Sequence, residues 1–183
     1  MIQELLEESK VKKKLIGLDL YGDEGYWCGI VIDYNDDTFQ MQHYTKFGEK
    51  DGITVDEISK IERIDFDDKY LNSINYLITK QAELKENIHK NRFFEDLLGD
   101  EWQVLALTPY LNEKNFLISL SISGDATYRG FVNRIDDYSF IFKCVGELGE
   151  DKGSSLFKFE DVFSMKINDL ECRKRFILYK KNH

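Results

Sequence analysis

The sequence contains few of the residues that interrupt or crosslink a chain. It has one proline, Pro109, and no glycine- or serine-rich run, so no segment has the composition of a disordered linker. Its three cysteines, Cys28, Cys144 and Cys172, are scattered and odd in number. This pattern excludes the disulfide framework that stabilises many small secreted domains.

Long apolar runs and targeting signals are missing too. No run of apolar residues has the length that a membrane-spanning helix requires. The first residues are acidic, with Glu4, Glu7 and Glu8, whereas a signal peptide begins with basic residues and continues with apolar ones. We therefore expect a cytoplasmic protein with no membrane partner.

The sequence also lacks the patterns that mark common catalytic and metal sites. Its histidines, His43, His89 and His183, show no His-x-x-x-His spacing, and there is no Cys-x-x-Cys, so we predict no metal site. No phosphate-binding glycine loop or nucleophile elbow is present. Carboxylates cluster in predicted turns, where water disfavours the desolvation that general acid–base catalysis requires. We expect a protein that is not an enzyme and needs no cofactor.

Positive charge is scarce where a nucleic-acid-binding protein would need it. The net charge is −9. Residues 13–67 carry 13 acidic and 6 basic side chains, residues 114–169 carry 9 and 7, and residues 170–183 carry one and 5. Binding to phosphates depends on a basic face, so the acidic first half disfavours nucleic acid. The basic C-terminal segment is either a handle for an anion or a solubilising element that pairs with acidic residues.

The most informative feature is a pattern that occurs twice. Residues 15–23 recur at 117–125, and one residue is lost before Gly29-Ile30-Val31 recurs as Gly130-Phe131-Val132. The new offset then relates three further pairs: Asp36 and Asp137, Phe39 and Phe140, Gly48 and Gly149. A constant offset over about fifty residues indicates the duplication of a small β-rich module.

Within each copy, hydrophobic periodicity predicts five short strands. In the first copy, Ile16, Leu18 and Leu20 alternate with other residues, as in a half-buried strand. Further strands are expected over 26–34 and 39–43, and residues 53–61 predict a short strand, one helical turn and another strand. Five strands with one helical turn before the last are typical of an SH3-like small barrel, in which closure protects the sheet edges.

Helical patterns lie outside the predicted strands. Residues 1–12 predict a short amphipathic helix, and residues 69–98 are helical in character, with Gly99 as a stop. Residues 102–111 and 170–181 each fit either a strand or a helix. We predict an α+β protein, mainly β, of two tandem small barrels. An N-terminal helix and the first barrel occupy residues 1–68, a helical connector 69–112, and the second barrel with a C-terminal element 113–183.

The order of strands and glycines resembles the Sm-like (LSm/Hfq) superfamily of small barrels. The second copy carries the first Sm motif as Ile118-x-Leu120-x-Ile122-x-Gly124, then Gly130 and, six residues later, Asp136. The first copy matches over 16–29, but its Asp36 stands seven residues after Gly29. The resemblance implies a second strand bent at glycine, an aspartate that holds the next turn, RNA binding or RNA-linked regulation, and assembly into an oligomer.

The residues through which Sm-like proteins contact RNA are not retained. The family's RNA-contacting asparagine corresponds to Phe140, and the Arg-Gly of the second motif is replaced by Asp56-Glu57 and Glu160-Asp161. If the chain nevertheless binds RNA, the residues that would contact it are Asp136, Arg129, Arg134, Arg173, Lys174 and Arg175.

Acidic and aromatic residues instead favour a protein partner. The candidate acidic surface consists of Asp56, Glu57, Asp65 and Asp67. The aromatic candidates, Tyr26, Trp27 and Tyr128, precede the strand glycines, where SH3-like domains often hold extended peptides, although core packing is the alternative. We expect a binding protein with a basic partner, one version being an immunity-type inhibitor that masks a basic, nucleic-acid-cleaving enzyme. An Sm-like RNA-binding protein is the alternative.

Overall fold

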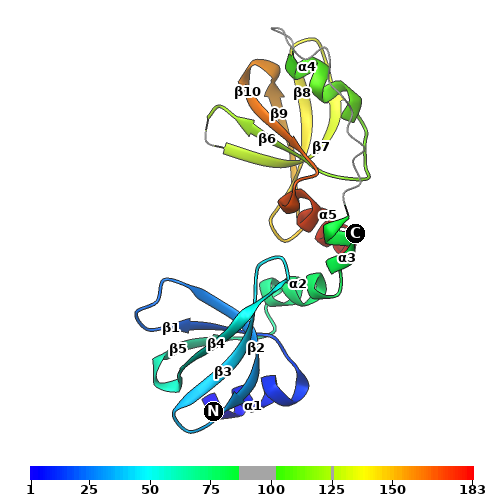
Figure 1. The fold of residues 1–183 in the computed structure, drawn as a ribbon. Coiled ribbons are helices and arrows are strands. Elements are labelled where there is room, and N and C mark those ends of the chain that lie inside the picture. The colour runs from blue at the N-terminus through cyan, green and yellow to red at the C-terminus, as the bar shows by residue number, and fades with distance from the viewer. Residues whose placement is uncertain (87–101, 125) are drawn as a thin grey trace. The chain divides into compact units, whose positions relative to one another are not determined.

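The chain forms two compact units, each built on its own β-sheet. The computed structural model describes residues 1–86, 102–124 and 126–183, and the units are Met1–Gln81 and Ala82–His183 (Figure 1). Each contains a five-stranded antiparallel sheet with helices before and after it, which confirms the α+β class. The boundary falls inside the predicted connector, and His89 and Gly99 lie outside the described residues.

The first unit starts with the predicted helix and continues with five strands. Its elements are α1 (Ile2–Lys12), β1 (Ile16–Leu20), β2 (Tyr26–Tyr34), β3 (Thr38–Tyr44), β4 (Lys50–Glu57), η1 (Ile58–Lys60), β5 (Ile61–Asp65) and α2 (Lys69–Ile78). The strand order is β4-β3-β2-β1-β5. Buried Ser9 joins α1 to β2, because its Oγ accepts a hydrogen bond from the Val31 N–H at 3.1 Å and donates one to the Lys14 carbonyl at 2.7 Å.

The second unit repeats this plan. α3 (Gln81–Lys85) spans the unit boundary, and the elements that follow are α4 (Trp102–Leu107), η2 (Thr108–Tyr110), β6 (Ile118–Ile122), β7 (Ala126–Ile135), β8 (Ser139–Val145), β9 (Asp151–Lys158), η3 (Phe159–Asp161), β10 (Val162–Ile167) and α5 (Leu170–Asn182). The strand order is β10-β6-β7-β8-β9. Both segments that fit either a strand or a helix are therefore helical.

The duplication extends beyond the residues in which the sequence reveals it. Gly29 lies opposite His43 and Gly130 lies opposite Cys144, so the two sheets share one register. The helices after the sheets also correspond. Asp68 accepts the Leu71 N–H at the start of α2, and Asp169 accepts the Cys172 N–H at the start of α5, each at 2.7 Å. A side-chain cap of this kind satisfies one of the free N–H groups of a helix and fixes its first residue.

The strands form open sheets and not the closed barrels that the sequence predicts. In the described part of each unit, the first strand pairs with the second and fifth, and the fourth pairs only with the third. The short helical turns η1 and η3 redirect the chain between the fourth and fifth strands, so that the fifth strand continues along the first. Each sheet therefore retains two edges, and β4 and β9 each form one.

The turn between the second and third strands is held by the same device in both units. Asp136 Oδ1 accepts the N–H groups of Tyr138 and Ser139, at 2.9 and 2.7 Å, as the resemblance implies. In the first unit, Asn35 takes this role and accepts from Asp37 and Thr38. Asn35 stands six residues after Gly29, so the spacing is the same in both copies and Asp36 is not the residue that holds the turn.

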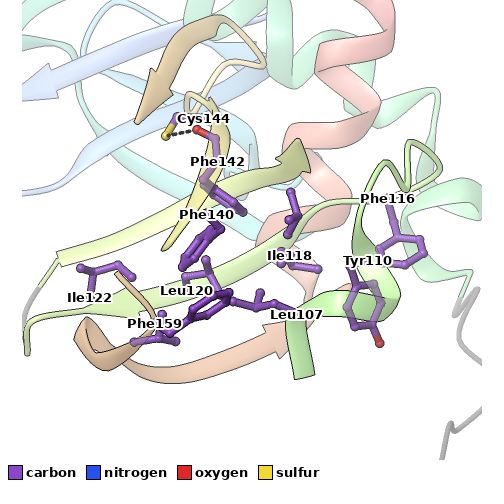
Figure 2. Packing of buried hydrophobic residues seen from close by; sticks show 12 residues of the cluster. Leu107, Tyr110, Phe116, Ile118, Leu120, Ile122, Phe140, Phe142, Cys144 and Phe159 are labelled. Atoms are coloured by element: carbon purple, nitrogen blue, oxygen red, sulfur yellow. Dashed lines mark hydrogen bonds between the residues drawn. The ribbon is translucent and has the colours of Figure 1, made fainter. Parts of the chain in front are cut away.

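The second unit has the more aromatic core. Figure 2 shows Phe140, Phe142 and Phe159 packed together with Leu120, and Leu107 of α4 adjoins them. In the first unit, the corresponding core is mainly aliphatic around Phe39. A Cβ atom on Gly130 would lie 1.9 Å from the Lys143 carbonyl oxygen, so β7 can approach β8 this closely only at a glycine. No helix within the described ranges is long and apolar enough to cross a membrane.

Candidate functional site

Trp27 is the centre of the site that the structure favours in the first unit. It lies on β2 opposite Leu18 and packs against the core while remaining half-buried. Its Nε1–H donates to Asp23 Oδ2 at 2.7 Å, and the Gly25 N–H donates to Asp23 Oδ1 at 3.0 Å. The bond from Trp27, followed by that from Gly25, holds the pKa of Asp23 below its ordinary value. A carboxylate that stays ionised is thus fixed beside an aromatic ring.

His43 extends this arrangement along β3. Its ring centroid lies 5.1 Å from that of Trp27, with the two planes at 65°. His43 Nδ1 lies 3.4 Å from Asp51 Oδ2, and the Asp51 side chain is 64% exposed.

Asp56 brings a second, less accessible carboxylate to the same face. It lies on β4 opposite Phe39, a core residue, and its side chain is 26% exposed. Lys60 Nζ lies 2.8 Å from Asp56 Oδ1 and lowers the pKa of Asp56, with help from the Glu57 N–H. The charge of Asp56 in turn opposes ionisation of Asp23. We call Asp23, Trp27, His43, Asp51 and Asp56 the acidic aromatic site.

Three of the five positions of this site are apolar in the second unit. The three counterparts are Tyr128 for Trp27, Cys144 for His43 and Phe157 for Asp56. The rings of Tyr128 and Phe157 have centroids 4.8 Å apart, and Phe157 also lies 5.8 Å from Phe140. The second unit therefore has aromatic packing where the first unit presents the Asp56 carboxylate, and it has Lys152 where the first unit has Asp51.

The other aromatic candidate, Tyr26, does not join this site. Successive strand residues face opposite sides of a sheet, and Tyr26 packs on the side covered by α2, with its ring 5.8 Å from that of Tyr70. Burial, and then the charge of Asp65, raise the pKa of Tyr26. Tyr26 and Trp27, which the sequence groups together, therefore serve different surfaces.

The four acidic candidates also separate into two places. Glu57 is exposed next to Asp56 and accepts a hydrogen bond from the Ser59 hydroxyl at 3.2 Å. Asp65 lies 3.2 Å from Arg63 Nε, and Asp67 lies 2.7 Å from Lys14 Nζ near the start of α2. Only Asp56 and Glu57 adjoin the acidic aromatic site.

The basic residues near the C-terminus bind groups of their own unit. Arg173 donates to the carbonyl oxygens of Leu84, at 2.7 Å, and of Asn168. Arg175 donates to the Val145 carbonyl at 3.0 Å. Lys174 is 2% exposed and lies 3.0 Å from Glu171 and 3.4 Å from Glu147. This segment holds α5 in place and does not present three free cations.

The remaining RNA candidates are dispersed. Arg129 is half-buried on β7, and its Nε has no hydrogen-bond partner in the described structure. Arg134 is exposed towards the end of β7, and the Asp136 carboxylate is occupied in its turn. Arg129 lies close enough to α5 for its charge to oppose the rise in the pKa of Cys172, whereas Arg134 and Asp136 lie at and beyond the other end of β7.

The cysteines have the environment of buried apolar residues. All three are free and buried, and burial raises the pKa of Cys28 and of Cys172 to about 12. A thiol that stays protonated is a poor nucleophile and a poor metal ligand. Across the residues that the structure describes, no group of three or more histidine, cysteine or acidic side chains could hold a metal ion.

Comparison of the chain with protein-family models, with curated proteins and with solved structures found no match.

Three members of the site, Asp23, His43 and Asp51, are not among the binding residues predicted from the sequence. Strand alternation offers a signal for His43, because it follows Phe39 and Met41 at alternate positions of β3 and therefore lies on the same face of the sheet. Asp23 is harder to find, since its link to Trp27 depends on how the β1–β2 turn folds back. Asp51 reaches His43 across a shift of register between β3 and β4.

Proposed function

We propose that this chain is a non-enzymatic binding protein whose first unit engages a basic protein partner through the acidic aromatic site. The observation that carries this proposal is the contrast between Asp56 and Phe157. Asp56 keeps a charged, partly accessible carboxylate that Lys60 stabilises, whereas Phe157 at the equivalent place packs on Tyr128 and Phe140. Asp56 is therefore better explained by a binding role than by packing.

The distribution of charge supports a basic partner. Met1–Gln81 contains 17 acidic and 10 basic residues, a net charge of −7, whereas Ala82–His183 has 17 and 15, a net charge of −2. An acidic field raises the rate at which a cationic partner associates, and a half-buried aromatic ring beside carboxylates suits lysine and arginine side chains. An immunity-type inhibitor of a basic nucleic-acid-cleaving enzyme is the specific version that we propose, acting in the cytoplasm.

The architecture beneath this function is also part of the proposal. We infer that each unit is an SH3-like or Sm-like module whose sheet is not closed into a barrel. Support comes from the strand order, from the single helical turn before the last strand and from the glycine on the second strand. Fold does not determine activity, and the RNA-binding alternative has less support because Arg173, Lys174 and Arg175 already have partners.

The test compares capture of partners by matched variants. Tagged wild-type protein is incubated with lysate of the source organism, with and without RNase, and captured proteins are identified by mass spectrometry. We expect a basic protein that resists RNase and is lost at high salt. Asp23→Asn with Asp56→Asn should slow its association about tenfold at low salt, because both changes remove charge but keep the size of each side chain.

The control variant is Asp65→Asn with Asp67→Asn, which removes the same charge away from the site. Equal slowing by both double variants would show that the general field matters and the site does not. Recovery of RNA, or of proteins that disappear after RNase treatment, would favour the Sm-like alternative.

A further inference from the structure

Strand β4 presents an edge whose side chains have an unusual distribution. Ile53 and Val55 are 61% and 60% exposed, although both residues are strongly apolar. They lie opposite Gln42 and Gln40, on the face of the sheet away from the core, while Asp56 faces the core side. Strand β4 thus presents apolar residues on its outer face and the Asp56 carboxylate on its inner face.

The backbone of this edge is available for pairing. Among the described residues β4 pairs with β3 alone, so the N–H and C=O groups on its other side have no strand partner. Such an edge accepts an added strand, and native proteins usually protect exposed edges by charge or by cover. Asp51 and Glu57, near the two ends of β4, discourage pairing with an acidic strand and favour a basic one.

The equivalent edge of the second unit has the opposite charge. β4 contains three acidic residues and one lysine, whereas β9 contains one acidic residue and two lysines, Lys152 and Lys158. Leu156 is 65% exposed on β9, so the apolar component is present there too. The two edge strands therefore differ in the sign of their charge and in their exposed apolar residues, since Ser154 of β9 stands where β4 has Ile53.

We propose that β4 binds an extended, basic segment of the partner as an added strand, with apolar residues at alternate positions. In this arrangement, the apolar residues lie beside Ile53 and Val55 on the outer face. The lysine or arginine residues between them point to the inner face, towards Asp56. This inference rests on the proposed function and names the form in which the basic partner is recognised.

The experiment uses the full-length protein and a defined peptide, acetyl-KVKVKVK-amide. Binding is followed by nuclear magnetic resonance, with hydrogen exchange of the amides of residues 50–57. We expect binding with slower exchange in β4. A second peptide of identical sequence, methylated on its backbone nitrogens, keeps the charge and the side chains but cannot donate backbone hydrogen bonds, and it should not protect β4.

Matched variants locate the contact. Ile53→Ser with Val55→Ser should weaken the peptide about tenfold, because two cross-strand apolar pairs are lost. Both side chains are exposed, so the core is not disturbed. The control, Leu156→Ser in β9, should leave the affinity unchanged.

Other outcomes would overturn the inference in distinguishable ways. If both peptides bind equally and perturb Trp27 but leave β4 exchange unchanged, strand addition is wrong while the proposed function survives. If neither binds, and the lysate yields no basic partner either, both proposals fail. A dimer of the free protein that the double serine variant dissociates would show that a second copy of the chain occupies the edge.

Discussion

The two units use one backbone register for different purposes. Asp56 and Phe157 occupy equivalent places on the fourth strands, opposite Phe39 and Phe140. Phe157 enlarges an aromatic core, whereas Asp56 takes part in a polar site with Trp27. Both residues lie on an edge strand and are only partly buried, so the fold accepts either an aspartate or a phenylalanine at this position. A duplicated module therefore has positions that can become functional without changing the architecture.

The largest loss of stability should appear when the aromatic core residues are truncated. Phe140→Ala should cost about 3–5 kcal/mol of unfolding free energy, because Phe140 is buried among other rings. Phe39→Ala, in the more aliphatic core, should lie at the lower end of that range. Urea titrations can separate the units, since Trp27 and Trp102 are the two tryptophans and report one unit each. Equal losses would show that the aromatic cluster adds nothing beyond its burial.

Exchange of the two divergent residues tests the comparison directly. Phe157→Asp should destabilise the second unit by about 3 kcal/mol, because it removes ring contacts with Tyr128 and Phe140 and places a carboxylate among aromatic side chains. Asp56→Phe should change the first unit much less, since it loses the partly exposed pair with Lys60 and one hydrogen bond from the Glu57 N–H. A large destabilisation by Asp56→Phe would mean that Asp56 has a structural role.

The helix caps should behave alike in both units. Asp68→Ala and Asp169→Ala each remove an acceptor at 2.7 Å from a helical N–H, and each should cost about 1 kcal/mol. Asparagine retains the acceptor, so Asp68→Asn and Asp169→Asn should recover most of this loss. Calorimetry of the four variants provides the comparison, and a cap that matters in one unit only would break the equivalence of α2 and α5.

The smallest effect should be a dependence of stability on pH in the first unit. The pKa values of Asp23 and Asp56 are lowered in the folded state, so their stabilisation is complete above the ordinary aspartate pKa of about 3.9. It is lost as the pH falls through the lower folded values. The stability of the first unit can be measured against pH by following unfolding through the fluorescence of Trp27. Asp23→Asn with Asp56→Asn should reduce the loss of stability at acid pH, and an unchanged loss would contradict the lowered pKa values of the two aspartates.

The sequence predicts strands well wherever one face of the sheet is buried. Alternation at Ile16, Leu18 and Leu20 identifies β1, and the repeat transfers this assignment to β6. Helices whose apolar residues show no clear period are harder to predict. The segment that forms α5 fits a strand equally well in sequence, and the Asp169 cap and the burial of Cys172, Ile177 and Leu178 stabilise it as a helix. The open form of the sheets could not be predicted, because it depends on the direction that η1 and η3 impose on the fifth strand.

The candidate site is predictable only in part. Trp27 and Asp56 can be found from composition, since an aromatic residue before the strand glycine and an acidic pair before η1 are visible in the sequence. Their grouping with His43 and Asp51 depends on strand register. The basic residues of α5 illustrate the opposite error, because a charged run does not reveal that Lys174 is buried between two glutamates.

The helices that flank each sheet have a consequence for synthesis of the protein. Because α1, the five strands of the first sheet and α2 all belong to Met1–Gln81, these elements have been synthesised before the second unit begins. The first unit can therefore complete its core on the ribosome without strands from the second copy, whose similar register would otherwise compete for pairing. Duplication of the whole segment, helices included, thus protects the chain from exchange of strands between its two halves.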